Sequence, residues 1–121
     1  MAETTRLRMG EIIQSVFRVL VSHPEGLQVR LVTSEVEKIL PLTEYEQSFY
    51  PDRPGSRRFD KIIRFSTIGP VKAGWLIKEK GIWTLTAEGQ EALNAFPDPL
   101  ELMRENVRLY REWKKSARPT E

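Results

Sequence analysis

Apolar residues in the first third of the chain recur with the period of an α-helix, in two separate runs. Ile12, Val16, Val19 and Leu20 are spaced i, i+4, i+7 and i+8, which predicts a helix over residues 9–21. His23-Pro24-Glu25-Gly26 then breaks the pattern. A second stripe of valine, isoleucine and leucine predicts a helix over residues 28–40, which Pro41 ends. We expect the polar residues 1–8 to be a flexible N-terminus.

The segment after Pro41 is predicted to be a connecting segment with one short helical turn, not a long helix or strand. Thr43 is followed three residues later by Glu46, the spacing of a capping box, so we expect a short helical turn there. Residues 50–55, Tyr-Pro-Asp-Arg-Pro-Gly, have the composition of a loop.

A third helix is predicted from Ser56 or Arg57 onwards. Its core side is predicted to comprise Phe59, Ile62, Ile63 and Ser66, whereas Arg57, Lys61 and Arg64 fall on another face. Proline is unfavourable inside a helix, so Pro70 predicts a kink or break between Ile68 and Val71. Gly74 is expected as a left-handed cap at the end of this segment.

A tight β-hairpin is predicted directly after this helix. Residues 75–79 and 82–85 are its strands, and Lys80-Gly81 is the turn, where Gly81 can adopt a positive φ. Thr86 is expected to cap a helix that runs to about Phe96. A helix followed at once by a short β-ribbon is the order of a winged helix. The predicted fold is therefore α+β and mostly helical, a winged helix-turn-helix with a short two-stranded hairpin as the wing.

A further helix is predicted at the C-terminal end, over residues 100–115, with Asp98 as its cap and Pro99 in its first turn. One apolar line on this helix comprises Leu100, Met103, Val107, Tyr110 and Trp113. So much apolar surface should be covered. A second copy is slightly favoured as the cover, while docking on the chain's own domain and contact with a following domain stay open. The predicted division is 1–8 flexible, 9–96 winged helix and 97–121 C-terminal helix.

Composition narrows the classes of function. The chain has 121 residues, 40% of them hydrophobic, which suits one domain with a modest core. There is no cysteine and a single histidine, His23, beside a turn, and no Gly-rich phosphate loop is present. We therefore expect a non-enzymatic protein without metal or cofactor. The first ten residues have no apolar signal region, and no apolar run is long enough for a membrane span, so a cytoplasmic protein is expected.

Positive charge is concentrated in the third predicted helix. The net charge is only +2, but residues 53–72 hold six basic residues and one acidic residue. Such a patch beside a hairpin favours a docking face for nucleic acid. The candidate DNA-binding residues are Arg53, Arg57, Arg58, Lys61, Arg64 and Thr67, with Lys78 and Lys80 on the hairpin as candidates for backbone contacts.

Four short motifs together resemble a known family. They are Leu42-Thr43-Glu44, Arg58-Phe59, Lys72-Ala73-Gly74-Trp75-Leu76 and the run from Trp83 to Gly89. In these residues the chain resembles the N-terminal winged-helix domain of Mrr-type restriction proteins, over roughly residues 10–93. The resemblance implies a target-recognition domain that binds double-stranded DNA in a protein that cuts modified foreign DNA. It also implies a C-terminal nuclease domain outside this sequence.

The chain departs from the family pattern in the third helix. Lys61 and Ile62 replace an Asn-Arg pair, Phe65-Ser66 replaces a Trp-Ala pair, and Pro70 replaces a leucine. Base reading by the family's Asn and Arg is therefore not carried over. Two other functions stay open: a stand-alone dimeric transcription regulator that pairs through the last helix, and a winged helix that binds protein and no DNA.

Overall fold

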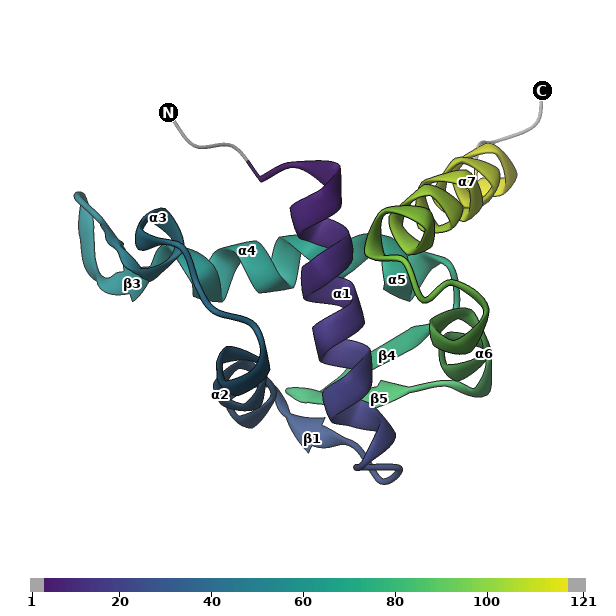
Figure 1. Cartoon of the computed structure of the whole chain (residues 1–121), viewed down its shortest axis with the longest axis horizontal. Coiled ribbons are helices and arrows are strands. Elements are labelled where there is room, and N and C mark those ends of the chain that lie inside the picture. The colour runs from purple at the N-terminus through teal and green to yellow at the C-terminus, as the bar shows by residue number, and fades with distance from the viewer. Residues whose placement is uncertain (1–3, 118–121) are drawn as a thin grey trace.

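The computed structural model describes residues 4–117 and has an α+β, winged-helix-like fold (Figure 1). In chain order the elements are α1 (Arg6–Val21), β1 (Leu27–Gln28), α2 (Val29–Ile39), α3 (Glu44–Gln47), β2 (Phe49–Tyr50), β3 (Arg53–Arg57), α4 (Arg58–Ser66), α5 (Ile68–Lys72), β4 (Leu76–Glu79), β5 (Ile82–Leu85), α6 (Ala87–Ala95) and α7 (Pro99–Ala117). The first three and last four residues of the predicted terminal segments lie outside the described residues.

Helix α1 begins earlier than its apolar stripe predicted. Thr5 caps it by accepting a hydrogen bond from the backbone N–H of Arg8, so the described part of the predicted flexible N-terminus is largely helical. Arg8 is also anchored, because its guanidinium binds the Glu46 carboxylate through Nε (2.8 Å) and Nη2 (2.7 Å). The ion pair ties α1 to α3 across 38 residues of chain, a contact that helical periodicity does not reveal.

The wing belongs to a three-stranded sheet of order β1-β5-β4, not to a two-stranded hairpin alone. Strand β1 is only two residues long and pairs Leu27 with Trp83, so it carried no period-2 signal in the sequence. The predicted turn is confirmed: Lys80 has φ 53° and Gly81 has φ 78°, the two positive values of a two-residue hairpin turn.

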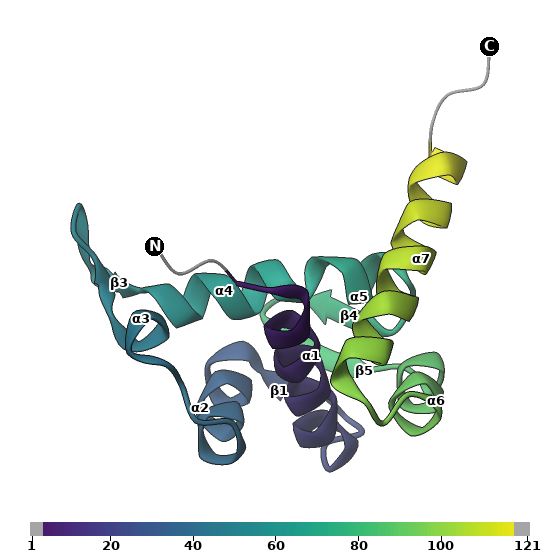
Figure 2. The same ribbon diagram turned by 45° about the horizontal axis from the view of Figure 1, so that its top comes forward.

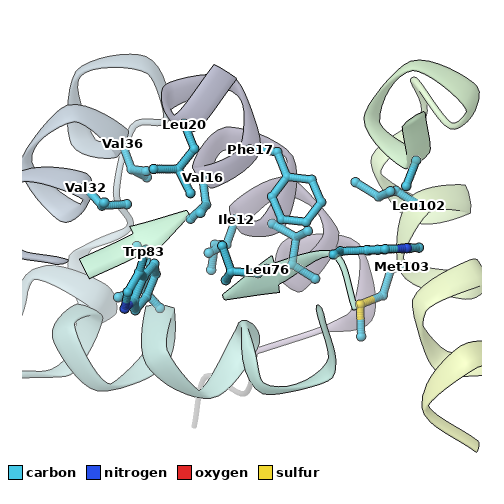
Figure 3. Packing of buried hydrophobic residues seen from close by; sticks show 14 of the residues in the cluster. Ile12, Val16, Phe17, Leu20, Val32, Val36, Leu76, Trp83, Leu102 and Met103 are labelled. Atoms are coloured by element: carbon cyan, nitrogen blue, oxygen red, sulfur yellow. The ribbon is translucent and has the colours of Figure 1, made fainter. Parts of the chain in front are cut away.

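One apolar core joins the sheet to the helices (Figure 3). Phe17 of α1 packs edge-on against Trp75, with ring centroids 6.1 Å apart. The predicted core face of the third helix is confirmed for Phe59, Ile63 and Ser66, which are buried, and Ile62, which packs against the core. This packing fixes which side of α4 remains in solvent.

The third predicted helix is broken, at Thr67, one residue before the predicted window from Ile68 to Val71. It ends at Ser66, Thr67 is the linking residue, and α5 restarts at Ile68 with Pro70 inside it. Proline in a helix clashes with the carbonyl four residues before it and cannot donate a hydrogen bond to it. For Pro70 that carbonyl belongs to Ser66, which explains why the break precedes the proline.

The segment between α2 and α4 contains a second hairpin that the sequence did not reveal. The predicted capping box is confirmed, since Thr43 and Glu46 exchange both hydrogen bonds at the start of α3. Strands β2 and β3 then pair Tyr50 with Arg53 within the segment predicted as a loop. The segment is rich in proline and glycine, which are disfavoured in strands, so its composition indicated a loop. The hairpin projects at the N-terminal end of α4 (Figure 1).

Helix α7 docks on the chain's own domain through its first half. Asp98 caps it and Pro99 opens it, as predicted. Leu102 and Met103 are buried in the common core, and Asn106 is buried beside α5. Figure 2 shows the second half of the helix extending away from the body. Within the described residues, self-docking therefore covers part of the apolar surface of α7.

Candidate nucleic-acid interface

The solvent side of α4 and the start of α5 carry two cations and two apolar side chains. Lys61, Arg64 and Phe65 follow at i, i+3 and i+4 on one face of α4, and Ile68, the first residue of α5, lines the same groove as they do. Phe65 is 62% exposed and Ile68 is 43% exposed. Neither Lys61 nor Arg64 forms an ion pair within residues 4–117. We name this surface, Lys61, Arg64, Phe65 and Ile68, the α4 face.

Two grooves flank the α4 face. The first, about 680 Å³, lies between α2, β3 and α4 and is lined by five basic and two acidic residues. The second, about 510 Å³, lies between α4 and the β4–β5 wing. We call them the hairpin groove and the wing groove. Lys61 and Arg64 line both, so their side chains form a cationic ridge between two concave surfaces.

Lys78 extends the positive surface onto the wing. Its ammonium donates a hydrogen bond to the backbone carbonyl of Arg64 (3.3 Å) and lies 4.4 Å from the ring centroid of Trp83. Burial, together with the nearby charge of Arg64, lowers the pKa of Lys78 to about 8. Lys80 is exposed in the wing turn, and Arg53 is exposed in β3 on the wall of the hairpin groove. Five predicted DNA-binding residues therefore line these two grooves: Arg53, Arg57, Lys61, Arg64 and Lys78.

Arg57 and Arg58 are held by partners in the protein rather than projecting freely. Arg57 precedes α4 and donates two hydrogen bonds to the Glu37 carboxylate of α2, and a third to Asp60. Arg58 donates to Ser48 Oγ (2.7 Å) and lies 4.8 Å and 4.9 Å from the ring centroids of Tyr45 and Tyr50. These contacts attach α4 to α2, α3 and the β2–β3 hairpin. The two arginines thus position the α4 face.

The assignment of Thr67 to the DNA-binding surface is corrected by its burial. Its side chain is 0% exposed, and its hydroxyl donates to the carbonyls of Ile63 (2.8 Å) and Arg64 (3.0 Å). A threonine hydroxyl can satisfy backbone acceptors at a helix end in this way. Thr67 therefore stabilises the break between α4 and α5.

Three residues of this surface were missed in the sequence. Arg30 of α2 lines the hairpin groove, and Phe65 and Ile68 line the wing groove. Arg30 lies 23 residues before the basic segment, and only the fold brings it near β3. Phe65 and Ile68 follow Lys61 by four and seven residues, and this helical spacing was a signal in the sequence that they lie near it.

The chain contains one part of a pattern found in metal-dependent nucleases. That pattern is an aspartate followed later by Glu-x-Lys, and Glu112-Trp113-Lys114 is such a triplet. Glu112-Trp113-Lys114 follows Asp98 by fourteen positions. Asp98 is the cap of α7, and Glu112 lies on the same helix, where a rise of about 1.5 Å per residue separates them by roughly 20 Å. Glu112 instead pairs with Arg108. Among residues 4–117 no cluster of three His, Asp or Glu side chains could hold a metal ion.

The predicted partner line on α7 divides between the core and the surface. Met103 is 7% exposed and packs in the core, whereas Val107 packs partly against it. Tyr110 is half-buried and Trp113 is 37% exposed, with their ring centroids 5.7 Å apart. Lys72 of α5 lies 4.6 Å from the Trp113 ring centroid. Leu100 is half-buried near the start of the helix.

The family model of the Mrr N-terminal domain matches residues 10–95. The chain belongs to this family. It thereby contains a domain associated with restriction systems, and the matched domain is not itself the catalytic part of Mrr proteins. No curated protein and no solved structure shows significant similarity to the chain. In the described part of this Mrr N-terminal domain protein, no helix is long and apolar enough to cross a membrane.

Proposed function

We propose that this chain is a double-stranded DNA-binding module, the target-recognition part of a restriction protein that senses modified DNA in the cytoplasm. The supporting observation is the ridge of Lys61 and Arg64 between the hairpin groove and the wing groove: both cations are exposed, and neither has a carboxylate partner within residues 4–117. A groove of B-DNA admits a helix, and flanking cations bind its phosphates. In this arrangement α4 enters the major groove, and Lys78, Lys80 and Arg53 bind the backbone on either side.

The apolar half of the α4 face supports recognition of modified bases. Phe65 and Ile68 are exposed beside the cationic ridge. Large apolar side chains are more often buried, so two exposed ones side by side indicate a contact surface. Apolar side chains in the major groove contact the methyl group at C5 of thymine. A methyl group at C5 of cytosine occupies the equivalent place. Phe65 is thus the residue proposed to contact a modified pyrimidine.

A duplex titration with a charge-matched control tests DNA binding. Lys61→Ala combined with Arg64→Ala removes two cations from the ridge and leaves the Arg57–Glu37 pair intact. We expect the slope of log K against log salt to become less steep by about 1.8, because each phosphate contact contributes about 0.9. The control is Arg18→Ala with Arg104→Ala, two exposed cations on α1 and α7. Equal affinity and slope in the two double variants would place the DNA-binding surface elsewhere.

The modified-base proposal has its own readout. Duplexes that differ only by 5-methylcytosine should bind the parent with different affinities, and Phe65→Ala should remove that difference while retaining salt-dependent binding. Salt-dependent binding without any preference in the parent would leave a DNA-binding module that is not a modification sensor. Absence of salt-dependent binding would favour the protein-binding winged helix.

Two partners are proposed beyond DNA: a second copy that pairs through the exposed half of α7, and a C-terminal nuclease domain. Tyr110 and Trp113 are the side chains available for a dimer on this helix. Sedimentation of the parent and of the Trp113→Glu variant tests the pairing with a second copy. A concentration-dependent dimer that the variant loses supports pairing through α7, and a parent that stays monomeric at high concentration rejects it.

A further inference from the structure

Asp60 is a carboxylate among the five cations of the hairpin groove. It lies in the first turn of α4, and its side chain is 52% exposed. Lys61 follows it directly, and Arg64 follows one turn later on the same side of the helix. A surface that binds phosphates through its positive charge alone would bind them better without Asp60, because a carboxylate repels them. The presence of Asp60 therefore indicates a role other than phosphate binding.

The contacts of Asp60 within the protein occupy only half of its carboxylate. Nη2 of Arg57 donates a hydrogen bond to Asp60 Oδ1 (3.1 Å), but the same guanidinium also binds both carboxylate oxygens of Glu37. Asp60 Oδ2 accepts no hydrogen bond within residues 4–117, and Arg64 does not pair with it there. Exposed ion pairs contribute little stability, and the helix dipole favours an acidic residue anywhere in the first turn. Neither effect explains a carboxylate that lines the groove.

The chemistry of a carboxylate determines which base it can contact. An ionised carboxylate only accepts hydrogen bonds, so it selects donors. In the major groove the N4 amino group of cytosine and the N6 amino group of adenine are donors, whereas guanine and thymine present acceptors. In adenine the amino group lies beside the N7 acceptor, which repels a carboxylate, while in cytosine its neighbour is the carbon C5. A carboxylate in the major groove therefore favours cytosine.

The position of Asp60 on α4 suits contact with a base edge. In helix-turn-helix proteins the N-terminal residues of the recognition helix are the ones that contact bases. The aspartate side chain is short, so a helix deep in the groove brings it to the bases, while the longer Lys61 and Arg64 side chains extend toward phosphates. Asp60 lines the hairpin groove and Phe65 lines the wing groove, so the two side chains contact different base pairs.

We infer that Asp60 determines sequence specificity by accepting a hydrogen bond from the N4 amino group of a cytosine in the major groove. The inference rests on the proposed DNA binding and adds one base to what the module recognises. Asp60 Oδ2 accepts from the N4 hydrogen that points into the groove. Oδ1 stays with Arg57, whose hydrogen bond holds the orientation of the carboxylate.

The base preference of the whole chain is measured by selecting bound duplexes from a pool with a randomised centre and sequencing them. We expect the parent to prefer a C·G pair at one position by at least about fivefold, the lower end of what a good base contact contributes. Asp60→Ala should lose this preference and keep the preferences at other positions. Asp60→Asn should shift it toward A·T, because asparagine pairs with N6 and N7 of adenine.

A chemically modified duplex tests the atom that Asp60 contacts. N4-methylcytosine at the preferred position places a methyl group where the N4 hydrogen points into the major groove, and base pairing is kept. The parent should bind this duplex at least about fivefold more weakly than the unmodified one. Asp60→Ala should bind the two duplexes equally.

Asp52→Asn is the matched control, because it removes the same charge from an exposed residue of the β2–β3 turn that does not line the groove. Both Asp52→Asn and Asp60→Asn should raise duplex affinity at low salt, but only the control should keep the C·G preference. Circular dichroism checks that each variant is folded. A parent that binds duplexes without this preference, or a folded Asp60→Ala variant that retains it, overturns the inference and leaves the DNA-binding proposal standing. A parent without salt-dependent duplex binding overturns both.

Discussion

Arg57 and Glu37 form a two-pronged ion pair between the residue preceding α4 and the last turn of α2. Nη1 of Arg57 lies 3.0 Å from Oε1 of Glu37, and Nη2 binds Oε2. The arginine side chain is 21% exposed and the glutamate side chain 31% exposed, so the pair is partly shielded from water. The pair joins the junction of β3 and α4 to α2, and it neutralises a cation on the wall of the hairpin groove.

Glu37→Gln should loosen this pair and release Arg57 toward the groove. We expect duplex affinity at low salt to rise by about two- to fivefold, because the groove gains one net positive charge, and the free energy of unfolding to fall by about 1 kcal/mol. Glu35→Gln is the matched control, since it removes the same charge from a more exposed pair with Lys38 on α2. Equal effects of the two substitutions on affinity would contradict a specific role of Arg57.

The lowered pKa of Lys78 predicts a dependence of stability and binding on pH. The folded-state value of about 8 lies below the ordinary 10.5, so the unfolded chain binds the proton more tightly. Unfolding free energy should therefore rise as the pH increases from about 8 toward 10.5, and Lys78→Met should flatten this rise. Because a phosphate favours the protonated amine, duplex affinity should fall between pH 7 and pH 9.

Lys78→Arg serves as the control for binding, since arginine keeps its charge over this range. Its duplex affinity should change less with pH than that of the parent. A parent and Lys78→Arg variant with identical pH profiles would mean that Lys78 does not contact phosphate.

Glu46 predicts sensitivity to acid. Burial raises the pKa of its carboxyl, but hydrogen bonds from Arg8 and the Thr43 backbone, with the charge of Arg8, hold the pKa below the usual 4.5. A folded-state pKa below the unfolded value contributes stability that is complete above 4.5 and is lost as the pH falls through the lowered value. Glu46→Ala should cost about 2–4 kcal/mol at pH 7, since it leaves a part-buried arginine and an uncapped turn.

Urea unfolding at several pH values measures this contribution. Glu112→Gln removes one partner of an exposed pair with Arg108, which water screens, and should leave the free energy of unfolding nearly unchanged. If the stability of Glu46→Ala depends on pH between 5 and 3 as steeply as that of the parent, the acid sensitivity originates in another carboxylate.

Leu102 predicts that α7 contributes to the stability of the winged helix. Its side chain is 0% exposed in the shared core, so Leu102→Ala should lower the free energy of unfolding by about 2–5 kcal/mol. Trp113→Ala, further along the helix and 37% exposed, should cost less than about 1 kcal/mol if the chain is monomeric. Chemical unfolding of both variants decides this, and comparable losses would indicate that the outer half of α7 is also covered in solution.

The sequence specified those features that depend on neighbours along the chain. The caps at Thr43, Thr86 and Asp98, the wing turn at Lys80-Gly81 and the left-handed Gly74 were all predicted and are confirmed. Each of them is decided within about four residues, by hydrogen bonds between a side chain and the next turn or by a backbone angle. Local chemistry was sufficient to place them.

Features that depend on distant partners were not predictable in the same way. Arg57 had the helical spacing of Lys61 and Arg64, and Arg58 was a candidate from the same basic segment, but their partners Glu37 and Ser48 lie 20 and 10 residues away. Strand β1 exists only because β5 passes beside it. Helical spacing shows on which side of a helix a residue lies, whereas the burial of Thr67 and the pairing of Arg57 depend on what the fold brings to that side.

Gly10 has a consequence for where this domain can be cut. A Cβ at this position would lie 2.1 Å from the carbonyl oxygen of Pro99, so the backbones of α1 and α7 meet at a glycine near the start of the stretch that the family model matches. Pro99 lies beyond the end of that stretch. A fragment that stops at residue 95 would keep every residue of the match and lose Leu102 and Met103, which are buried in the same core as the α1 side chains. We expect such a fragment to be less stable than the whole chain, because boundaries drawn from sequence similarity alone divide a single hydrophobic core.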